Sequence, residues 1–303
     1  MNTLKAPQRL QIGPYKLTLL DTGRFALDGG AMFGVVPKAI WHKLLPADDL
    51  NRVPLALNCL LIETENEKIL FETGIGSKFE AKLQKIYDVH QYDEIENAKQ
   101  LPIEWALAEA GIKPAEINKV LFSHLHFDHA GGGTKKLDNG SVVPTFPNAQ
   151  YFVHKGEWEQ AECPHERCKA SYLKENFMPL KESGQLTLLD KNETEIAPGL
   201  FLRKTGGHTP HHQVLILDLP DLKTFPKGFL FWADLLPTRF HVRIPFVMGY
   251  DEFPMEVMDQ KRKLLKEAND KQWLHMFEHE LEHPVCRLSP TADAPNTYTV
   301  EAF

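Results

Sequence analysis

Cysteine is scarce in this 303-residue sequence, which has four such residues, at positions 59, 163, 168 and 286. Four thiols are too few to form a disulfide framework in a chain of this length. The two cysteines of CPHERC are separated by four residues, where a zinc knuckle usually has two. We therefore interpret this segment as a surface loop.

Long apolar runs and basic runs are also missing. No 18-residue apolar stretch occurs, and the first twenty residues lack the apolar core and cleavage site of a signal peptide. Thirty-four lysines and arginines stand against 41 acidic residues, a net charge of -7, with no basic stripe to follow a phosphate backbone. We expect a cytoplasmic protein that binds neither membrane nor nucleic acid.

The sequence has no serine-rich or glycine-rich linker and no repeat with a period of 20 to 50 residues. Its hydrophobic fraction of 43% is enough for a large core. We expect a single domain over residues 1–303. The serine-nucleophile turn G-x-S-x-G is missing as well, so the sequence shows no sign of catalysis by that route.

Short runs rich in Leu, Ile, Val and Phe recur along the chain and predict strands. They are YKLTLLD, ALNCLLIET, KILFET, KVLFSH, QYFVH, LFLRKT, HQVLILDL, GFLFWAD and QWLHMFEH. PIEWALAEAG begins with Pro102 and ends with Gly111, residues typical of the start and the end of a helix. Residues 254–268 place apolar side chains on one helical face, with Lys and Arg on the other, and predict a second helix. We predict an α/β fold, a four-layer αββα sandwich of two mixed β-sheets.

The segment SHLHFDHAGG concentrates titratable side chains at the end of one predicted strand. In extended chain, His124 and His126 share one side while Leu125 and Phe127 point to the other. Asp128 and His129 follow, where Gly131, Gly132 and Gly133 predict a turn and let backbone approach a ligand closely. A single histidine here would indicate only a hydrogen-bonded strand end. The full pattern H-x-H-x-D-H favours a divalent metal.

This pattern resembles the metal motif of the metallo-β-lactamase superfamily, and the resemblance extends roughly from Tyr15 to His279. It implies further ligands after later strands: His208 in TGGHTPHHQ, Asp234 in FWADLLP and His279 in FEHE. One metal would be held by His124, His126 and His208, and the other by Asp128, His129 and His279. Asp234 would bridge them. Glu72, in place of the usual aspartate, and His212 would support the ligands from outside.

The implied chemistry is hydrolysis by a hydroxide that bridges two metals about 3.5 to 4 Å apart. Asp128 would pass a proton to the leaving oxygen. The imidazoles and carboxylates suit zinc, our first choice, but also manganese, iron or cobalt.

The segment LDGGAMFGVVPKAIW, residues 27–41, resembles a loop of the quorum-quenching lactonases of this superfamily. We predict that a glycine turn presents Met32, Phe33 and Trp41 over the metals. A second apolar wall would be formed by Phe240, Phe246, Met248 and Tyr250. Ordinary core packing is the alternative for the aromatic residues. The resemblance favours a lactonase for acyl-homoserine lactones or similar small cyclic esters.

The sequence departs from some lactonases of the superfamily at one position. Those lactonases carry a tyrosine three residues after the bridging aspartate, whereas this chain has Pro237 there. Tyr250 is our candidate replacement, with His241 as a second. Two other functions remain open, an organophosphate triesterase and a metal-holding scaffold without turnover. The apolar residues of the N-terminal segment could also serve a homodimer.

Overall fold

All nine strand-like runs form strands in the computed structural model, which describes residues 7–89, 100–291 and 297–303. The chain divides into two compact units. Unit 1 comprises Met1–Phe25 and Leu57–Asp190, and unit 2 comprises Ala26–Ala56 and Lys191–Phe303. The prediction of one domain over residues 1–303 stays a prediction.

The first seven-stranded sheet has the order β1-β2-β3-β4-β5-β8-β9. Its strands are Gln8–Ile12 (β1), Tyr15–Asp28 (β2), Arg52–Glu63 (β3), Lys68–Phe71 (β4), Lys119–Leu121 (β5), Gln150–His154 (β8) and Leu186–Leu189 (β9). The sheet is mixed, because β1/β2 and β3/β4 pair antiparallel while β4, β5, β8 and β9 are parallel. Thr134–Lys136 (β6) and Val142–Pro144 (β7) form a separate antiparallel pair.

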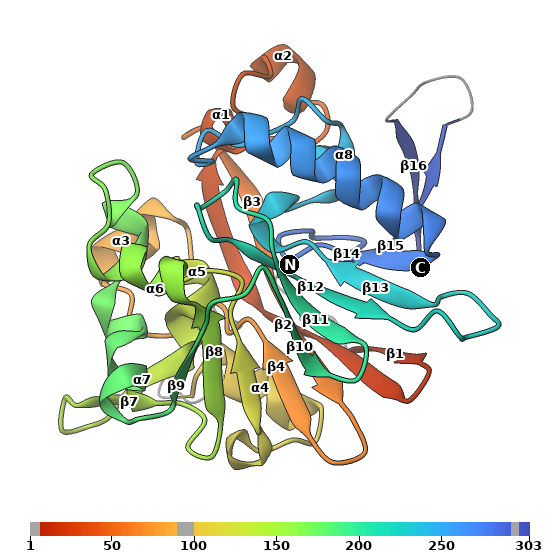
Figure 1. Cartoon of the computed structure of the whole chain (residues 1–303). Helices are drawn as coiled ribbons and strands as arrows, with labels where there is room; N and C mark the ends of the chain where they lie inside the picture. The colour runs from red at the N-terminus through yellow and green to blue at the C-terminus, as the bar shows by residue number, and fades with distance from the viewer. Residues whose placement is uncertain (1–6, 90–99, 292–296) are drawn as a thin grey trace. The chain divides into compact units, whose positions relative to one another are not determined.

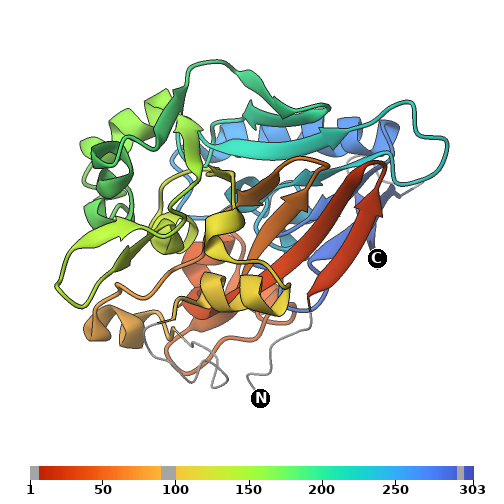
Figure 2. The ribbon, with the colours of Figure 1, turned by 90° about the horizontal axis from the view of Figure 1, so that it is seen from below.

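Unit 1 also contains five α-helices among its described residues. They are Ala81–Ile86 (α3), Pro102–Glu109 (α4), Phe127–Ala130 (α5), Lys155–Glu162 (α6) and Met178–Glu182 (α7). Helix α4 begins at Pro102 as predicted, and its buried Ile103 and Leu107 join the core formed with Leu61 of β3 and Leu70 of β4. Figure 2 shows this helix lying over the strands.

The second sheet also has seven strands, in the order β10 to β16. They are Glu193–Ala197 (β10), Leu200–Lys204 (β11), Gln213–Asp218 (β12), Gly228–Phe231 (β13), Trp273–Met276 (β14), Val285–Pro290 (β15) and Tyr298–Ala302 (β16). All neighbours pair antiparallel except β13 and β14, so this sheet is mixed too. Two mixed sheets with helices confirm the predicted α/β class.

Unit 2 carries Gly29–Phe33 (α1), Lys38–Trp41 (α2) and the long helix Pro254–Asp270 (α8). Helix α8 extends along β13, β14 and β15 (Figure 1) and buries Val257, Leu264 and Ala268 as the pattern predicts. Lys261 is also buried, against the expectation that all basic residues lie on the polar face. Among the described residues, no helix combines the length and the apolar character that crossing a bilayer requires.

Candidate metal centre

The H-x-H-x-D-H motif lies on a loop and a short helix. Strand β5 ends at Leu121, so His124 and His126 follow the strand and do not continue it, which corrects the expectation of an extended strand. His126 is the N-cap of α5, with φ -64° and ψ 158°, and Asp128 and His129 lie in that helix. The turn from extended chain into helix brings residues from both parts together.

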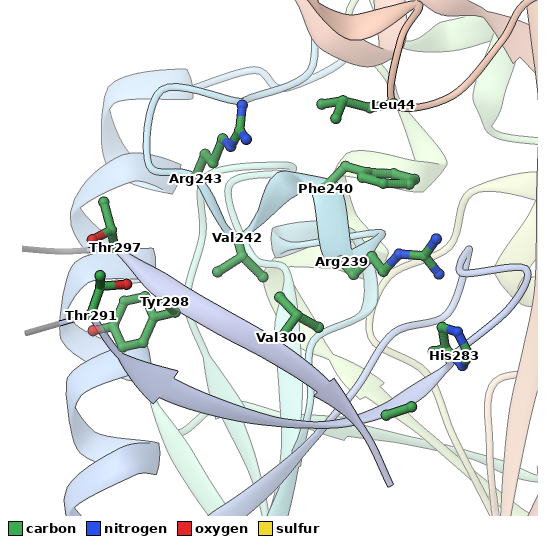
Figure 3. Close-up of a pocket in the computed structure, with 11 residues that line it drawn as sticks. Leu44, Arg239, Phe240, Val242, Arg243, His283, Thr291, Thr297, Tyr298 and Val300 are labelled. Atoms are coloured by element: carbon green, nitrogen blue, oxygen red, sulfur yellow. The ribbon is translucent and has the colours of Figure 1, made fainter. Parts of the chain in front are cut away.

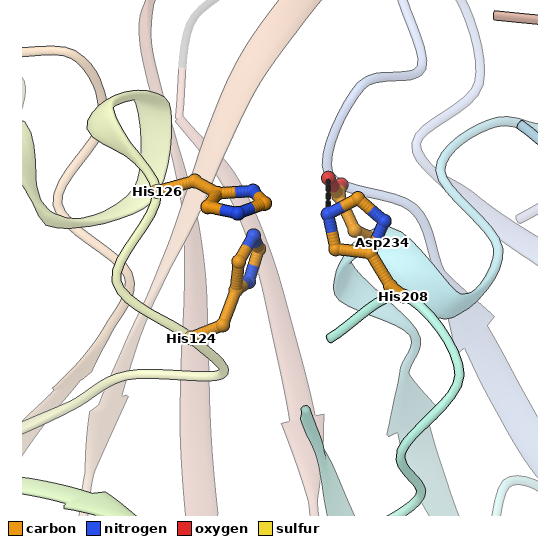
Figure 4. A group of neighbouring side chains, drawn as sticks. All are labelled: His124, His126, His208 and Asp234. Carbon is orange, nitrogen blue, oxygen red and sulfur yellow. Dashed lines mark ion pairs between the residues drawn. The ribbon is translucent and has the colours of Figure 1, made fainter. Parts of the chain in front are cut away.

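The donors of this motif are buried and close to one another within unit 1. The rings of His124 and His126 have centroids 4.4 Å apart, and those of His124 and His129 are 4.0 Å apart. The ligand atoms of His124 and His126 lie within 4.8 Å, and Asp128 Oδ2 lies 3.7 Å from His129 Nε2. Figure 4 shows the rings of His124 and His126 extending from the loop in the same direction.

Glu72 contacts this loop from the end of β4. Its backbone has φ 65°, and Oε1 accepts a 2.6 Å hydrogen bond from the backbone N–H of Ser123. Its Oε2 lies 3.6 Å from His129 Nδ1. The Ser123 hydroxyl pairs with His124 Nδ1 at 2.9 Å, which directs Nε2 of that ring away from the strand. The supporting role of Glu72 stays a prediction, and these contacts are compatible with it.

A second set of contacts on this loop has no pattern in the sequence. Glu157 of α6 is fully buried and accepts hydrogen bonds from the backbone N–H of Leu125 at 3.1 Å and from the Tyr172 hydroxyl at 2.9 Å. The ring of Tyr172 stands edge-on to His126, with centroids 4.7 Å apart. Glu157 and Tyr172 therefore fix the chain between the two histidines.

The glycines after the motif pack closely against a neighbouring segment, and their approach to a ligand stays a prediction. Residues Gly131–Gly133 form a 3₁₀ helix. A Cβ on Gly131 would lie 2.1 Å from the carbonyl oxygen of Ile75, and one on Gly132 would lie 2.2 Å from that of Thr73. Their small size permits the segment from Thr73 to Ile75 to pass close by.

Unit 2 by itself holds a second group of buried donors. His208, Asp234 and His279 each follow a strand, β11, β13 and β14 respectively. Asp234 Oδ2 lies 3.1 Å from His208 Nε2, a pair drawn in Figure 4, and Oδ1 lies 2.9 Å from His279 Nε2. One carboxylate thus presents one oxygen to each imidazole.

The other ring nitrogens define the protonation of these two histidines. His279 Nδ1 lies 2.8 Å from the carbonyl oxygen of Ala56, and His208 Nδ1 lies 2.9 Å from Asp251 Oδ1. Both partners accept, so Nδ1 carries the proton in each ring and a neutral ring offers the lone pair of Nε2. Two lone pairs and a carboxylate then face one another, an arrangement that a shared cation stabilises. This donor set fits a divalent metal.

Asp251 contacts the predicted ligand His208, and no pattern in the sequence indicated this contact. Its Oδ1 accepts from His208, and its Oδ2 accepts a 2.8 Å hydrogen bond from the backbone N–H of Met248. The segment GYDEFP gives no signal for this role, because Asp251 is far from His208 in the sequence. His212, predicted to support the ligands, pairs through Nδ1 with the Thr205 hydroxyl at 2.9 Å, and its role stays a prediction.

Residues 27–41 are not the open loop that their glycines suggest. Asp28 caps α1 by accepting from the backbone N–H of Ala31, and Met32, Phe33 and Trp41 are each at most 1% exposed. Phe33 and Trp41 stack with centroids 5.4 Å apart. A Cβ on Gly29 would lie 2.4 Å from the Trp41 ring, so this glycine permits tight packing.

The predicted second apolar wall packs against α1 within unit 2. Phe246 contacts Phe33 edge-on, with centroids 6.1 Å apart, and both Phe246 and Met248 are buried. A role of these five apolar residues in a substrate pocket stays a prediction. Tyr250 is 37% exposed, and its catalytic role also stays a prediction.

His241 is engaged on both sides of its ring, which corrects its nomination as a replacement for the missing tyrosine. Nε2 donates to the carbonyl oxygen of Met32 at 2.9 Å, and Nδ1 pairs with the Thr238 hydroxyl at 2.8 Å. The ring stacks on Phe33 at 4.9 Å, and complete burial lowers its pKa to about 3. A neutral imidazole with both nitrogens bonded serves the packing of α1.

Comparison with known proteins extends these observations. The model of the metallo-beta-lactamase superfamily matches residues 52–279. An N-acyl homoserine lactonase from a Bacillus species is 29% identical over 289 residues, which cover 91% of this chain and 97% of that relative. A probable metal-dependent hydrolase from Staphylococcus aureus is 28% identical, with a TM-score of 0.83 and coverage of 96% of this chain and 99% of that one.

A third protein shares the fold. AidC, a dizinc quorum-quenching lactonase solved with the product N-hexanoyl-homoserine, has a TM-score of 0.75 at 17% identity, with coverage of 98% of this chain and 97% of that one.

Proposed function

Because this chain belongs to the metallo-β-lactamase superfamily, whose model matches residues 52–279, we propose that it is a metal-dependent lactonase. Its substrates would be acyl-homoserine lactones or similar small cyclic esters. The observation that carries the proposal is the likeness to an N-acyl homoserine lactonase along 91% of this chain and 97% of the relative. The match of the family model, residues 52–279, spans the positions of all seven proposed ligands.

The proposal assigns two divalent metals. His124, His126 and His208 would hold one, Asp128, His129 and His279 would hold the other, and Asp234 would bridge them. The geometry within unit 2 supports the bridge, because the two oxygens of Asp234 face two different imidazoles. Zinc is proposed first, and manganese, iron or cobalt would suit the same donors.

Bound metals of this kind polarise a substrate carbonyl and lower the pKa of water towards about 7. The side chains of this chain supply the remaining steps. Asp128, buried beside His129, would accept the proton that the attacking water releases and pass it to the leaving alkoxide as the ring opens. Tyr250 would donate a hydrogen bond to the carbonyl or leaving oxygen, since its phenol is partly exposed on a turn after Met248.

Hydrolysis of phosphotriesters is not favoured, because curated relatives that match 91% of the chain are lactonases. A small-molecule substrate is proposed as the partner. The expected cytoplasmic location, the homodimer and the lack of nucleic-acid and membrane partners stay predictions.

Acid release tests the proposal. Zinc-loaded protein is mixed with a long-chain acyl-homoserine lactone in a weakly buffered indicator solution, beside a p-nitrophenyl phosphotriester. We expect proton release from the lactone and little nitrophenol. A Tyr250→Phe variant tests the proposed donor, since unchanged turnover would remove Tyr250 from the mechanism. Faster turnover of the phosphotriester than of any lactone would overturn the substrate assignment.

A further inference from the structure

The segment from Arg239 to Met248, which we call the wall segment, follows the proposed ligand Asp234 closely in the chain. It begins as a 3₁₀ helix, Arg239–Val242, and continues without regular structure. It carries Phe246 and Met248, both buried. Because few of its backbone groups bond to one another, its shape depends on contacts from other elements of unit 2.

One side of the wall segment borders a cavity of about 580 Å³. Arg239, Phe240, Val242 and Arg243 line it from the segment, and Tyr298 and Val300 lie opposite on β16 (Figure 3). Among the described residues, the cavity leaves part of this side of the segment without close packing. The position of the segment therefore depends on contacts from other elements.

Lys261 of α8 contacts the backbone in the middle of the segment. Its side chain is fully buried, and its Nζ donates to the carbonyl oxygens of Arg243 at 2.9 Å, Ile244 at 3.3 Å and Phe246 at 2.9 Å. These three acceptors use all three hydrogens of one ammonium group. Burial lowers the pKa of Lys261 to about 7, while the carboxylate of Asp251 opposes the shift. The ammonium form therefore dominates at pH 6.

The carbonyls that Lys261 holds are connected to both functional parts of unit 2. Phe246 itself packs edge-on against Phe33 of α1. Two residues later, the backbone N–H of Met248 bonds to Asp251, whose other oxygen accepts from the proposed ligand His208. A displacement of residues 243–246 would therefore move an apolar wall and loosen the partner of a ligand.

We propose that Lys261 is a positioning residue that fixes the wall segment and thereby sets the acyl-chain preference of the enzyme. The part that concerns the acyl chain rests on the proposed lactonase function. Lys261 touches no substrate atom in this account. Its effect is exerted through the backbone of residues 243–246.

Lys261→Met tests the proposal, because methionine keeps an apolar stem of similar length and removes the three donors. Lys263→Met is the matched control, an exposed lysine on the same helix. Hydrogen exchange of the amides of Phe246 and Met248 is measured at pH 6, with KM and kcat for a long-chain and a short-chain lactone. For Lys261→Met we expect faster exchange and a long-chain KM raised roughly tenfold, the scale for a few methylene groups losing their packing surface.

The short-chain KM should change much less, and Lys263→Met should match the wild type throughout. Unchanged exchange and an unchanged ratio of the two KM values in folded Lys261→Met would overturn the proposal. If that variant does not fold, Lys261→Gln, which keeps an N–H₂ donor, carries the same test. If the wild-type protein opens no lactone, the proposed function fails, whereas the exchange measurement still decides whether Lys261 holds the wall segment.

Discussion

At the scale of single residues, the central observation is that Asp234 lies between two imidazoles whose Nε2 atoms each face one of its oxygens. The protons of His208 and His279 are on Nδ1, because Asp251 and the carbonyl of Ala56 can only accept. Electron-pair donors brought this close repel one another unless a cation lies among them. The chemistry of these three side chains therefore fits a divalent metal.

Asp251→Asn tests how far that arrangement depends on its outer partner. An amide cannot accept from both His208 and the N–H of Met248 as an ionised carboxylate does, so the imidazole should lose orientation and basicity. We expect metal affinity to fall about 10- to 100-fold, measured by competition with a chelator. Asp259→Asn, on the exposed face of α8, is the control. Equal affinities in the two variants would remove Asp251 from the metal centre.

The burial of His241 predicts how the free energy of unfolding changes with pH. Its pKa is about 3 in the folded protein and 6.5 in the unfolded chain, so the unfolded chain binds the extra proton between these values. Stability must then fall as the pH falls through this window, by about 1.4 kcal/mol per pH unit at most from this group. His241→Gln removes the contribution. The unfolding free energy of the wild type minus that of the variant should decrease as the pH falls below 6.5. If the two curves of unfolding free energy against pH ran parallel, the lowered pKa of His241 would be contradicted.

The spacing of residues in the sequence predicted the candidate metal ligands, but not all of the residues that contact these ligands or their backbone. H-x-H-x-D-H is a local pattern, and each later ligand ends a visible strand. Glu157, Tyr172 and Asp251 reach the donors from elements far away in the chain, and a lone glutamate, tyrosine or aspartate has no period to reveal it. The burial of Lys261 was not predicted for a related reason, since a lysine within a helix is normally exposed to solvent.

At the scale of elements, the glycines were the weakest evidence. Gly29 and Gly131 were interpreted as turn residues, whereas each lies where a side chain would collide with a neighbour, the Trp41 ring or the carbonyl of Ile75. Sequence alone does not distinguish a glycine needed for its backbone angles from one needed for its size. Strands and long helices were predicted well because their periodicity reflects burial directly.

Gly131→Ala tests the close approach beside α5. The added Cβ would lie 2.1 Å from a backbone oxygen, so the turn carrying Asp128 and His129 must shift. We expect a loss of about 1–3 kcal/mol in unfolding free energy together with weaker metal binding. Gly140→Ala is the control, because its φ of 85° costs stability while no atom lies within 4 Å of the added Cβ. Metal affinity equal to that of the control would contradict this account of the turn.

At the scale of the whole molecule, the two mixed sheets and their helices were predictable, because strand runs and helix punctuation occur in both halves of the sequence. Each unit by itself presents its histidines and aspartates after strands, the positions that the sequence predicted. Substrate choice was less accessible. We propose that it depends on the packing of α1, α2 and the wall segment, whose short irregular elements leave no repeating pattern.

The most direct test of the account is a metal titration of chelator-stripped protein, with acid release from a long-chain acyl-homoserine lactone as the readout. The account predicts no turnover without metal and activity that rises to a plateau at two equivalents of zinc. His208→Ala should reach a much lower plateau at any zinc concentration. Full lactone turnover by stripped protein would contradict the metal mechanism, and a metal-loaded protein that releases no acid would contradict the lactonase assignment.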